Sequence, residues 1–169
     1  IKAAYHPNPT EGRRIARGCH YYGITLMCGT PTFINGVFRG SRDGQLDTLE
    51  HFVTGAEKLP DSVVDLVNGL PNAVILEGYG ITECAPVITI NRADEPQAGV
   101  GKPLPGVEIK IVDLDNHEEL KTGERGLILV NGPNVFAQYM GVDKDPFLEP
   151  ENARWYDTGD LGYLNEDGF

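Results

Sequence analysis

Short apolar, strand-like runs alternate with helix-like segments over the first half of the chain, and no other feature limits the fold so strongly. The strand-like runs are 24–28, 49–54 and 73–76, the first of which is expected to be a buried strand. The helix-like segments are 9–23, 30–40 and 60–68. Strands and helices that alternate at this spacing form right-handed βαβ units. The first half is therefore predicted to be α/β, with a largely parallel sheet and helices packed against it.

The sequence predicts the residues that cap the first helix. Asn8 is the expected N-cap, Pro9 the first helical residue, and Glu11 is placed to bond back to the cap. The helix is expected to end near Gly23 and to bury the residues that recur at helical spacing, Ile15, Cys19 and Tyr22. Its other face carries basic side chains, interpreted as a solvated face rather than a docking surface: Arg13, Arg14, Arg17 and His20.

After about residue 91 the pattern changes, because glycine and proline interrupt a passage with no helical periodicity. Short strand-like runs then follow at 107–112, 126–131 and 161–164, which predicts a small antiparallel sheet or barrel. We therefore expect an α/β portion over residues 1–104 and a β-rich subdomain over 105–169. The final turn, 165–168, predicts a hairpin whose second strand lies beyond Phe169, so the chain is interpreted as a piece of a longer protein.

Charge and cysteine content narrow the classes of function. Fourteen basic against twenty-five acidic residues give a net charge of -11, which argues against nucleic acid as a partner. The three cysteines show no metal spacing and are interpreted as reduced thiols in the core of a cytoplasmic protein. Cys84 in particular is expected to be a buried, inert thiol, since no partner base is evident.

The most informative run is 76–86, Leu-Glu-Gly-Tyr-Gly-Ile-Thr-Glu-Cys-Ala-Pro. A predicted strand leads into Gly78-Tyr79-Gly80, at the sheet edge where ligands of parallel sheets bind. The glycines permit close backbone approach, and the tyrosine offers a flat face to a base. Thr82 can donate to a phosphate oxygen, and Glu83 is a hard oxygen ligand suited to Mg²⁺. A strand-to-helix turn, with Tyr79 in the core and Thr82 as a cap, explains the same residues equally well.

Resemblance to a known family favours the ligand-binding interpretation. Residues 78–83 are similar to the Gly-Tyr-Gly-x-Thr-Glu motif of the adenylate-forming superfamily, and residues 155–163 resemble its Tyr-x-Thr-Gly-Asp element. Weaker connecting motifs lie between them in the expected order, at 101–106, 123–126 and 131–133.

The resemblance implies ATP or AMP and Mg²⁺ as ligands, and it implies a role for each matching position. Gly78 and Gly80 would line the nucleotide, Tyr79 would stack on adenine, and Thr82 would contact the α-phosphate. Glu83 would hold Mg²⁺, and Asp160 would accept hydrogen bonds from the ribose hydroxyls. The turn Gly55-Ala56-Glu57 would cover the other side of the adenine. Without the flanking match, Asp160 would be interpreted as an ordinary turn aspartate.

A narrower resemblance concerns residues 77–91, which look like the acyl-acyl-carrier-protein synthetases, including those fused to 2-acylglycerophosphoethanolamine acyltransferases. It implies a ligase that adenylates a fatty acid and passes the acyl group to acyl-carrier protein, with a role in phospholipid recycling. Medium- and long-chain acyl-CoA synthetases, which use CoA, are the close alternatives. Any association with the inner membrane would come through parts of the protein outside this sequence.

Two elements of the superfamily are absent from these 169 residues: the phosphate loop with its lysine, and the C-terminal lid domain with the adenylation lysine. The chain alone is therefore expected to be inactive, because phosphoryl chemistry depends on several such groups acting together. Two other classes remain open. One is a nucleotide-binding module without catalysis, and the other is an interaction domain without a ligand.

Overall fold

The computed structural model describes residues 2–141, 145–148 and 153–169, and the chain divides into two compact units. The first contains residues 1–78 and 92–97, and the second contains residues 79–91 and 98–169. The predicted domain boundary at residue 104 therefore lies within the second unit. Residues 79–91, which carry most of the first motif, belong to the same compact unit as the second motif.

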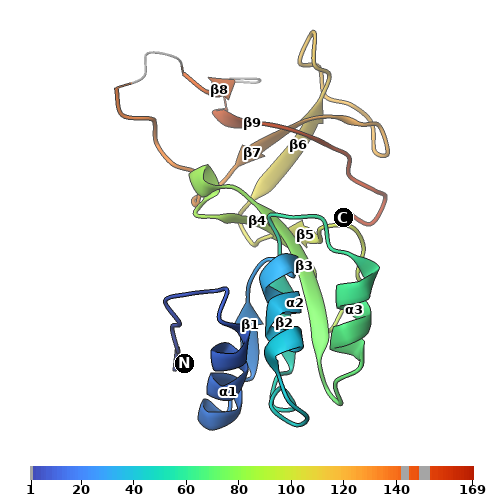
Figure 1. Cartoon of the computed structure of the whole chain (residues 1–169). Helices are drawn as coiled ribbons and strands as arrows, with labels where there is room; N and C mark the ends of the chain where they lie inside the picture. Colours follow the sequence, from blue (N-terminus) through green and yellow to red (C-terminus); the bar gives the residue numbers. More distant parts are fainter. Residues whose placement is uncertain (1, 142–144, 149–152) are drawn as a thin grey trace. The chain divides into compact units, whose positions relative to one another are not determined.

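The first unit is built on three parallel strands, β1 (Leu26–Cys28), β2 (His51–Thr54) and β3 (Val74–Gly80). They are hydrogen-bonded in the order β1-β2-β3, and the helices α1 (Gly12–Tyr22), α2 (Pro31–Gly40) and α3 (Asp61–Asn68) alternate with them along the chain (Figure 1). This arrangement confirms the predicted α/β class. The last two residues of β3 already belong to the second unit.

The core of the first unit joins the three helices to the centre of the sheet. Its largest fully buried side chain is Phe52 of β2, which stacks on Phe38 of α2 with ring centroids 5.6 Å apart. Around it pack buried residues from every helix, from the loop before β2 and from β3: Ala16, Cys19, Ile34, Val37, Leu46, Leu49, Val63, Val67 and Ile75.

Helices α1 and α2 approach each other through glycine. A Cβ atom built on Gly12 would lie 2.1 Å from the backbone oxygen of Gly36, and one on Gly40 would lie 2.4 Å from the backbone nitrogen of Arg13. No side chain fits at either position, so the close helix contact requires both glycines.

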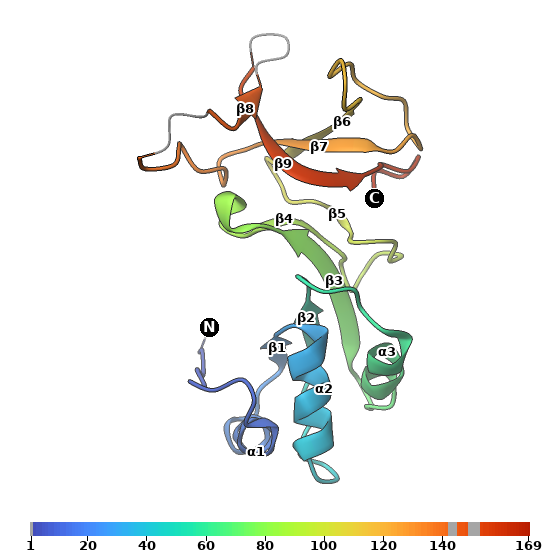
Figure 2. The ribbon, with the colours of Figure 1, turned by 45° about the horizontal axis from the view of Figure 1, so that its top comes forward.

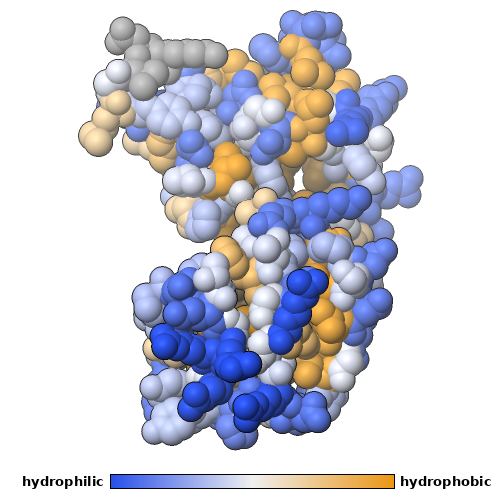
Figure 3. Space-filling view, viewed as in Figure 1, coloured by the Kyte–Doolittle hydropathy of each residue, from blue (hydrophilic) through white to orange (hydrophobic). Residues whose placement is uncertain are grey.

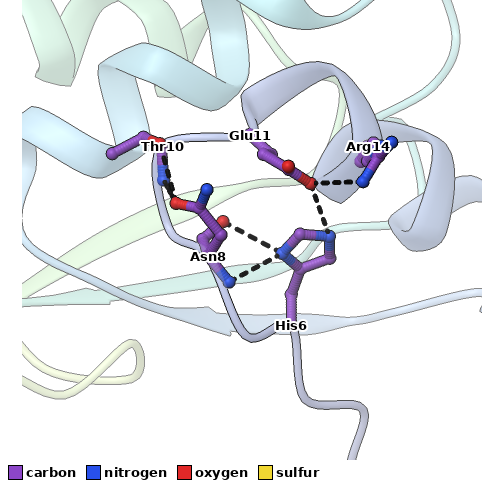
Figure 4. A network of polar contacts seen from close by, with 5 residues as sticks. All are labelled: His6, Asn8, Thr10, Glu11 and Arg14. Carbon is purple, nitrogen blue, oxygen red and sulfur yellow. Dashed lines mark hydrogen bonds and ion pairs between the residues drawn. The ribbon is translucent and has the colours of Figure 1, made fainter.

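The predicted start of the first helix is wrong. Asn8 does not cap α1; its carboxamide oxygen instead accepts hydrogen bonds from Thr10, at 3.0 Å from the backbone nitrogen and 2.7 Å from the hydroxyl (Figure 4). Asn8 thus closes a local turn, a role in which asparagine competes with helix capping. The helix begins one turn later, after Glu11, whose carboxylate pairs with Arg14 at 3.0 Å. The predicted end is confirmed, since Gly23 adopts the left-handed conformation with φ 61°.

Exposure corrects three further expectations in the first unit. Tyr22 is 67% exposed, and Ala16 rather than Tyr22 completes the buried face of α1. The apolar run at 24–28 predicted a buried strand, but Leu26 of β1 is 50% exposed because β1 is the outer strand of the sheet in this chain. For the same reason Cys28 is exposed, whereas Cys19 and Cys84 are buried.

The second unit contains a four-stranded antiparallel sheet with the order β6-β7-β9-β8 (Figure 2). Its strands are β6 (Glu108–Val112), β7 (Gly126–Asn131), β8 (Phe147–Leu148) and β9 (Trp155–Gly162). The antiparallel pair β4 (Val87–Ile90) and β5 (Lys102–Pro103) also belongs to this unit. A β-rich second part was predicted, but β4 and β5 lay outside the expected strands.

Among the described residues of the second unit, two buried clusters are found. One contains Val112, Leu127, Leu129 and Trp155. The other contains Cys84, Ile88, Val107, Val130 and Tyr156, with Tyr79 and Ile81 packed against it. The second cluster therefore links the segment after β3 to strands β7 and β9.

The surface of the first unit is strongly hydrophilic over α1 (Figure 3). The basic residues predicted for this face are all exposed or nearly so: Arg13, Arg14, Arg17 and His20. Among the described residues, no helix combines the length and apolar character needed to cross a membrane.

Candidate functional site

Two residues from the separate motifs, Tyr79 and Asp160, meet in the second unit. The phenol of Tyr79 donates a hydrogen bond of 2.6 Å to Oδ2 of Asp160, across 81 positions of sequence. Burial, and then this hydrogen bond, raise the pKa of the phenol well above its ordinary value. Tyr79 therefore stays neutral and a donor at physiological pH. The ring of Tyr79 packs against the core, as the structural interpretation expected, and its hydroxyl reaches the other motif.

A β-bulge presents Asp160. Strand β9 pairs regularly with β7 at Leu129↔Asp157 and at Leu127↔Leu161, so residues 158–160 lie opposite Ile128 alone. Gly159 takes a positive φ of 72° there. Bulges of this kind turn side chains out of the regular alternation of a strand, and they are common beside active sites.

The bulge is held by its own side chains. The hydroxyl of Thr158 donates to the carbonyl oxygen of Ile128 at 2.8 Å and accepts from the backbone nitrogen of Asp160 at 3.1 Å. Asp157 accepts from the nitrogen of Gly159 at 2.8 Å. Asp157 is thus occupied by the turn, while Asp160 is exposed.

Thr82 and Glu83 lie on one turn of 3₁₀ helix, η1 (Thr82–Cys84), directly after β3. Ile81, not Thr82, is the N-cap, and no side chain caps the turn, so the alternative role of Thr82 as a cap is wrong. Thr82 is exposed, which leaves its hydroxyl available to a ligand. Ala85 ends the turn at φ 55°, a left-handed conformation that costs an alanine about 1 to 2 kcal/mol.

Glu83 is held by a loop that the sequence interpretation missed. Its carboxylate oxygen Oε1 accepts a 2.6 Å hydrogen bond from the phenol of Tyr139, and its backbone oxygen accepts one of 2.8 Å from the nitrogen of Phe136. Nearby, the side-chain amide of Asn134 donates to the carbonyl oxygens of Cys84 and Val87, each at 2.9 Å. The only signal in the sequence was the weak motif at 131–133, which gave no reason to expect that Tyr139 meets Glu83.

Cys84 is a structural residue. It is fully buried, and burial together with the neighbouring Glu83 carboxylate raises the pKa of its thiol to about 11. A thiol with this pKa is almost entirely protonated at neutral pH and is a poor nucleophile. This agrees with the expectation of an inert thiol.

Of the remaining predicted residues, Gly80 lies in the second unit, where an added Cβ would be 2.0 Å from the backbone oxygen of Pro86, and the others lie in the first unit. A Cβ atom on Gly55 would lie 2.7 Å from the carbonyl oxygen of Gly78, so the two glycines lie against each other. Between Gly55 and Glu57, Ala56 has a positive φ of 66°. Strained backbone of this kind is concentrated at ligand-binding turns.

The side chain of Glu57 is directed to the start of α2. Its Oε2 accepts a 2.6 Å hydrogen bond from the hydroxyl of Thr32 and a longer one, 3.4 Å, from the backbone nitrogen of Thr32. The hydrogen bond from the hydroxyl lowers the pKa of Glu57 below its usual value. The carboxylate therefore anchors the turn, and the backbone of 55–57 is the part left for a ligand.

The residues around Glu83 fit Mg²⁺ bound together with nucleotide phosphates. In the described part of the chain, no group of three or more His, Cys, Asp or Glu side chains could enclose a metal. Mg²⁺ commonly uses only one or two carboxylates and completes its octahedron with water and substrate phosphates. A single carboxylate with one oxygen fixed by Tyr139 suits that mode.

Comparison with known proteins identifies the family. Residues 3–140 match the model of a family described as AMP-binding enzyme. The chain belongs to the AMP-binding enzyme family. This confirms the resemblance to adenylate-forming enzymes that the motifs at 78–83 and 155–163 predicted.

A relative and two solved structures illustrate membership of the AMP-binding enzymes. A long-chain-fatty-acid–CoA ligase of Salmonella typhimurium is 32% identical over 166 residues, which are 96% of this chain and 29% of the relative. A long-chain-fatty-acid-CoA ligase of Archaeoglobus fulgidus has a TM-score of 0.85 and 26% identity, over 94% of this chain and 35% of that one. ATP-bound MatB of Rhodopseudomonas palustris has a TM-score of 0.77 and 27% identity, over 95% of this chain and 32% of that one. The chain thus spans less than a third of the length of the Salmonella relative.

Proposed function

We propose that this chain is the central part of an ATP-dependent ligase that adenylates a fatty acid and transfers the acyl group to a thiol. The observation that carries the proposal is the 2.6 Å hydrogen bond between Tyr79 and Asp160, which joins the two nucleotide motifs. Similarity to a long-chain-fatty-acid–CoA ligase supports a fatty acid as substrate. It also favours CoA as the acceptor thiol, with acyl-carrier protein as the alternative from the narrower sequence resemblance.

Two half-reactions make up the proposed chemistry. A carboxylate oxygen of the fatty acid attacks the α-phosphorus of ATP. The bond between the α-phosphorus and the oxygen that bridges it to the β-phosphorus breaks, and acyl-AMP and pyrophosphate form. The sulfur of the acceptor then attacks the acyl carbon, AMP leaves, and the thiol proton is lost. Both steps depend mainly on positioning and on stabilisation of negative charge.

Each site residue has a defined part in this proposal. Tyr79 offers its ring to adenine and its hydroxyl to Asp160, and the exposed bulge offers the Asp160 carboxylate to the ribose hydroxyls. Thr82 donates to the α-phosphate, where the negative charge develops. Glu83 would hold Mg²⁺, which when bound neutralises phosphate charge.

Adenylate formation by the full-length protein tests the proposal. The protein is incubated with ATP, Mg²⁺ and fatty acids of graded length, and acyl-AMP is trapped as the hydroxamate. We expect product that depends on chain length and on ATP. CoA and acyl-carrier protein are then compared as acceptors, with a higher rate expected for CoA. Binding of ATP without any acyl-AMP would favour a non-catalytic nucleotide-binding module, and no ATP binding would favour an interaction domain.

A further inference from the structure

We propose that Tyr139 is a positioning residue for Glu83, which it holds with one carboxylate oxygen turned toward a divalent cation bound with nucleotide phosphates. The inference rests on the proposed function and adds to it a residue outside both motifs. Tyr139 comes from the segment between β7 and β8, 56 positions after Glu83.

The contact itself has the geometry of a strong hydrogen bond. The distance of 2.6 Å between the phenol oxygen and Oε1 lies in the range of hydrogen bonds from a hydroxyl to an ionised carboxylate. The phenol is hydrogen-bonded to Oε1 of Glu83, so Oε2 is left to bind a cation. Glu83 would then contribute one oxygen rather than two.

Tyr139 is itself fixed from two sides. Its ring packs edge-to-face on Phe136 with centroids 4.7 Å apart, and its oxygen lies 3.2 Å from the hydroxyl of Tyr156. Because the Tyr139 proton is used on Glu83, the Tyr156 hydroxyl must be the donor in that second contact. Tyr156 is buried on β9, four residues before Asp160. The hydroxyls of Tyr156 and Tyr139 therefore link β9, the strand that carries Asp160, to the carboxylate of Glu83 through two successive hydrogen bonds.

The same loop also fixes the backbone of Glu83. Phe136, on which the Tyr139 ring rests, donates its backbone N–H to the carbonyl oxygen of Glu83 at 2.8 Å. Backbone and side chain of Glu83 are thus both held by residues 136–139. Such a double contact matters most where one carboxylate is the main protein ligand, because Mg²⁺ requires near-octahedral geometry.

Replacing Tyr139 by phenylalanine tests the inference, because it keeps the ring and removes the donor. In the full-length protein, Mn²⁺ serves as the probe, and its binding is followed by electron paramagnetic resonance with a non-hydrolysable ATP analogue present. Loss of a residue that orients a metal ligand weakens metal binding by about 10- to 100-fold. We expect a loss of about tenfold for Tyr139→Phe, with kcat at saturating Mg²⁺ within about threefold of wild type.

Two comparisons separate positioning from general damage. Tyr163→Phe removes a phenol that is 59% exposed in the same unit and should leave Mn²⁺ binding unchanged. In the background of Glu83→Ala, Tyr139→Phe should cause no further loss, because the group that it orients is gone. If Tyr139→Phe does not fold, Tyr156→Phe is used instead, because it removes the hydrogen bond that Tyr156 donates to the Tyr139 hydroxyl. It should also reduce the affinity for Mn²⁺.

Three results would overturn the inference. One is Mn²⁺ binding by Tyr139→Phe within twofold of wild type, and another is an equal loss in the presence and absence of Glu83→Ala. The third is a wild-type protein that binds neither Mn²⁺ nor the ATP analogue. Only the third result would also contradict the proposed function.

Discussion

Asp160 is the side chain whose replacement is expected to affect nucleotide use most directly. Asp160→Asn keeps the shape of the side chain but removes its charge and one acceptor oxygen. A hydrogen bond to a charged group contributes about 1.5 to 3 kcal/mol. We therefore expect a loss of about 2 to 4 kcal/mol in kcat/KM for ATP in the full-length protein, roughly thirty-fold to a thousand-fold.

Asp157 is the matched control for this prediction. Its Oδ1 accepts a hydrogen bond from the nitrogen of Gly159 within the bulge, and the amide oxygen of asparagine can accept the same bond. Asp157→Asn should therefore leave ATP kinetics within a few-fold of wild type. Both variants are first shown to be folded by their thermal transitions. Equal losses, or a larger loss for Asp157→Asn, would show that the ribose contact has been assigned to the wrong carboxylate.

The carboxylate of Glu57 gives the first unit a pH-dependent contribution to stability. The hydrogen bond from Thr32 lowers the pKa of Glu57 below its unfolded value, so its stabilising effect is fully present above that value. The effect is lost as the pH falls through the folded pKa. We expect Glu57→Gln to lower the Tm at pH 7, and we expect this difference in Tm to shrink below about pH 4.5, the ordinary Glu value. A difference in Tm that is constant between pH 7 and pH 3 would contradict the assigned role of the charge.

Among the secondary-structure elements, the contact between α1 and α2 offers a matched pair of glycine substitutions. Gly12→Ala places a Cβ 2.1 Å from the backbone oxygen of Gly36, so the helices must separate. Overpacking of this kind costs about 1 to 3 kcal/mol or more. Gly18, on the same helix, has no atom within 4 Å of an added Cβ. Gly18→Ala should therefore stabilise the protein by up to about 1 kcal/mol, because alanine favours the helix.

Chemical denaturation measures both free energies of unfolding. A similar change for the two substitutions would show that helix propensity, and not the close contact at Gly12, determines the outcome. Helical content by circular dichroism should be retained in both variants, since neither substitution interrupts α1.

The sequence predicted helices and their ends correctly where proline or glycine alone determines the backbone conformation. Thr30-Pro31 marks the start of α2, and Gly23 ends α1, because proline and glycine limit the backbone directly. The start of α1 was missed because Asn8 can close a turn as readily as cap a helix. Strand β9 begins at Trp155 rather than near Leu161, because the second motif contains a glycine and polar residues that conceal a strand with a bulge.

The candidate site was predictable only in its motifs. Local sequence predicted Tyr79, Glu83 and Asp160 as site residues, but it could not show that Tyr79 and Asp160 are hydrogen-bonded to each other. The partner of Glu83 escaped prediction for the same reason. Tyr139 reaches it through tertiary packing around Phe136, and no periodicity in the sequence encodes that contact.

For the chain as a whole, the expected result is inactivity when these 169 residues are produced alone. They span 29% of the Salmonella relative and lack both lysine-bearing elements of the superfamily. Hydroxylamine trapping with ATP, Mg²⁺ and fatty acid should give no hydroxamate above background, because charge stabilisation at the phosphates would be incomplete. Robust product from the isolated chain would show that the residues described above are sufficient for adenylation.

The bulge in β9 also bears on how the chain tolerates changes in length. Between its regular pairs with β7, strand β9 has three residues where β7 has one, so the excess is two. With an even excess, the side chains after the bulge point to the same faces of the sheet as they would in a regular strand. An odd excess would turn every later side chain to the opposite face. Deleting Gly159 and Asp160 together should therefore restore a continuous ladder and give a folded protein without the carboxylate. Deleting Gly159 alone should shift Leu161 and Gly162 out of phase and disrupt the end of the sheet.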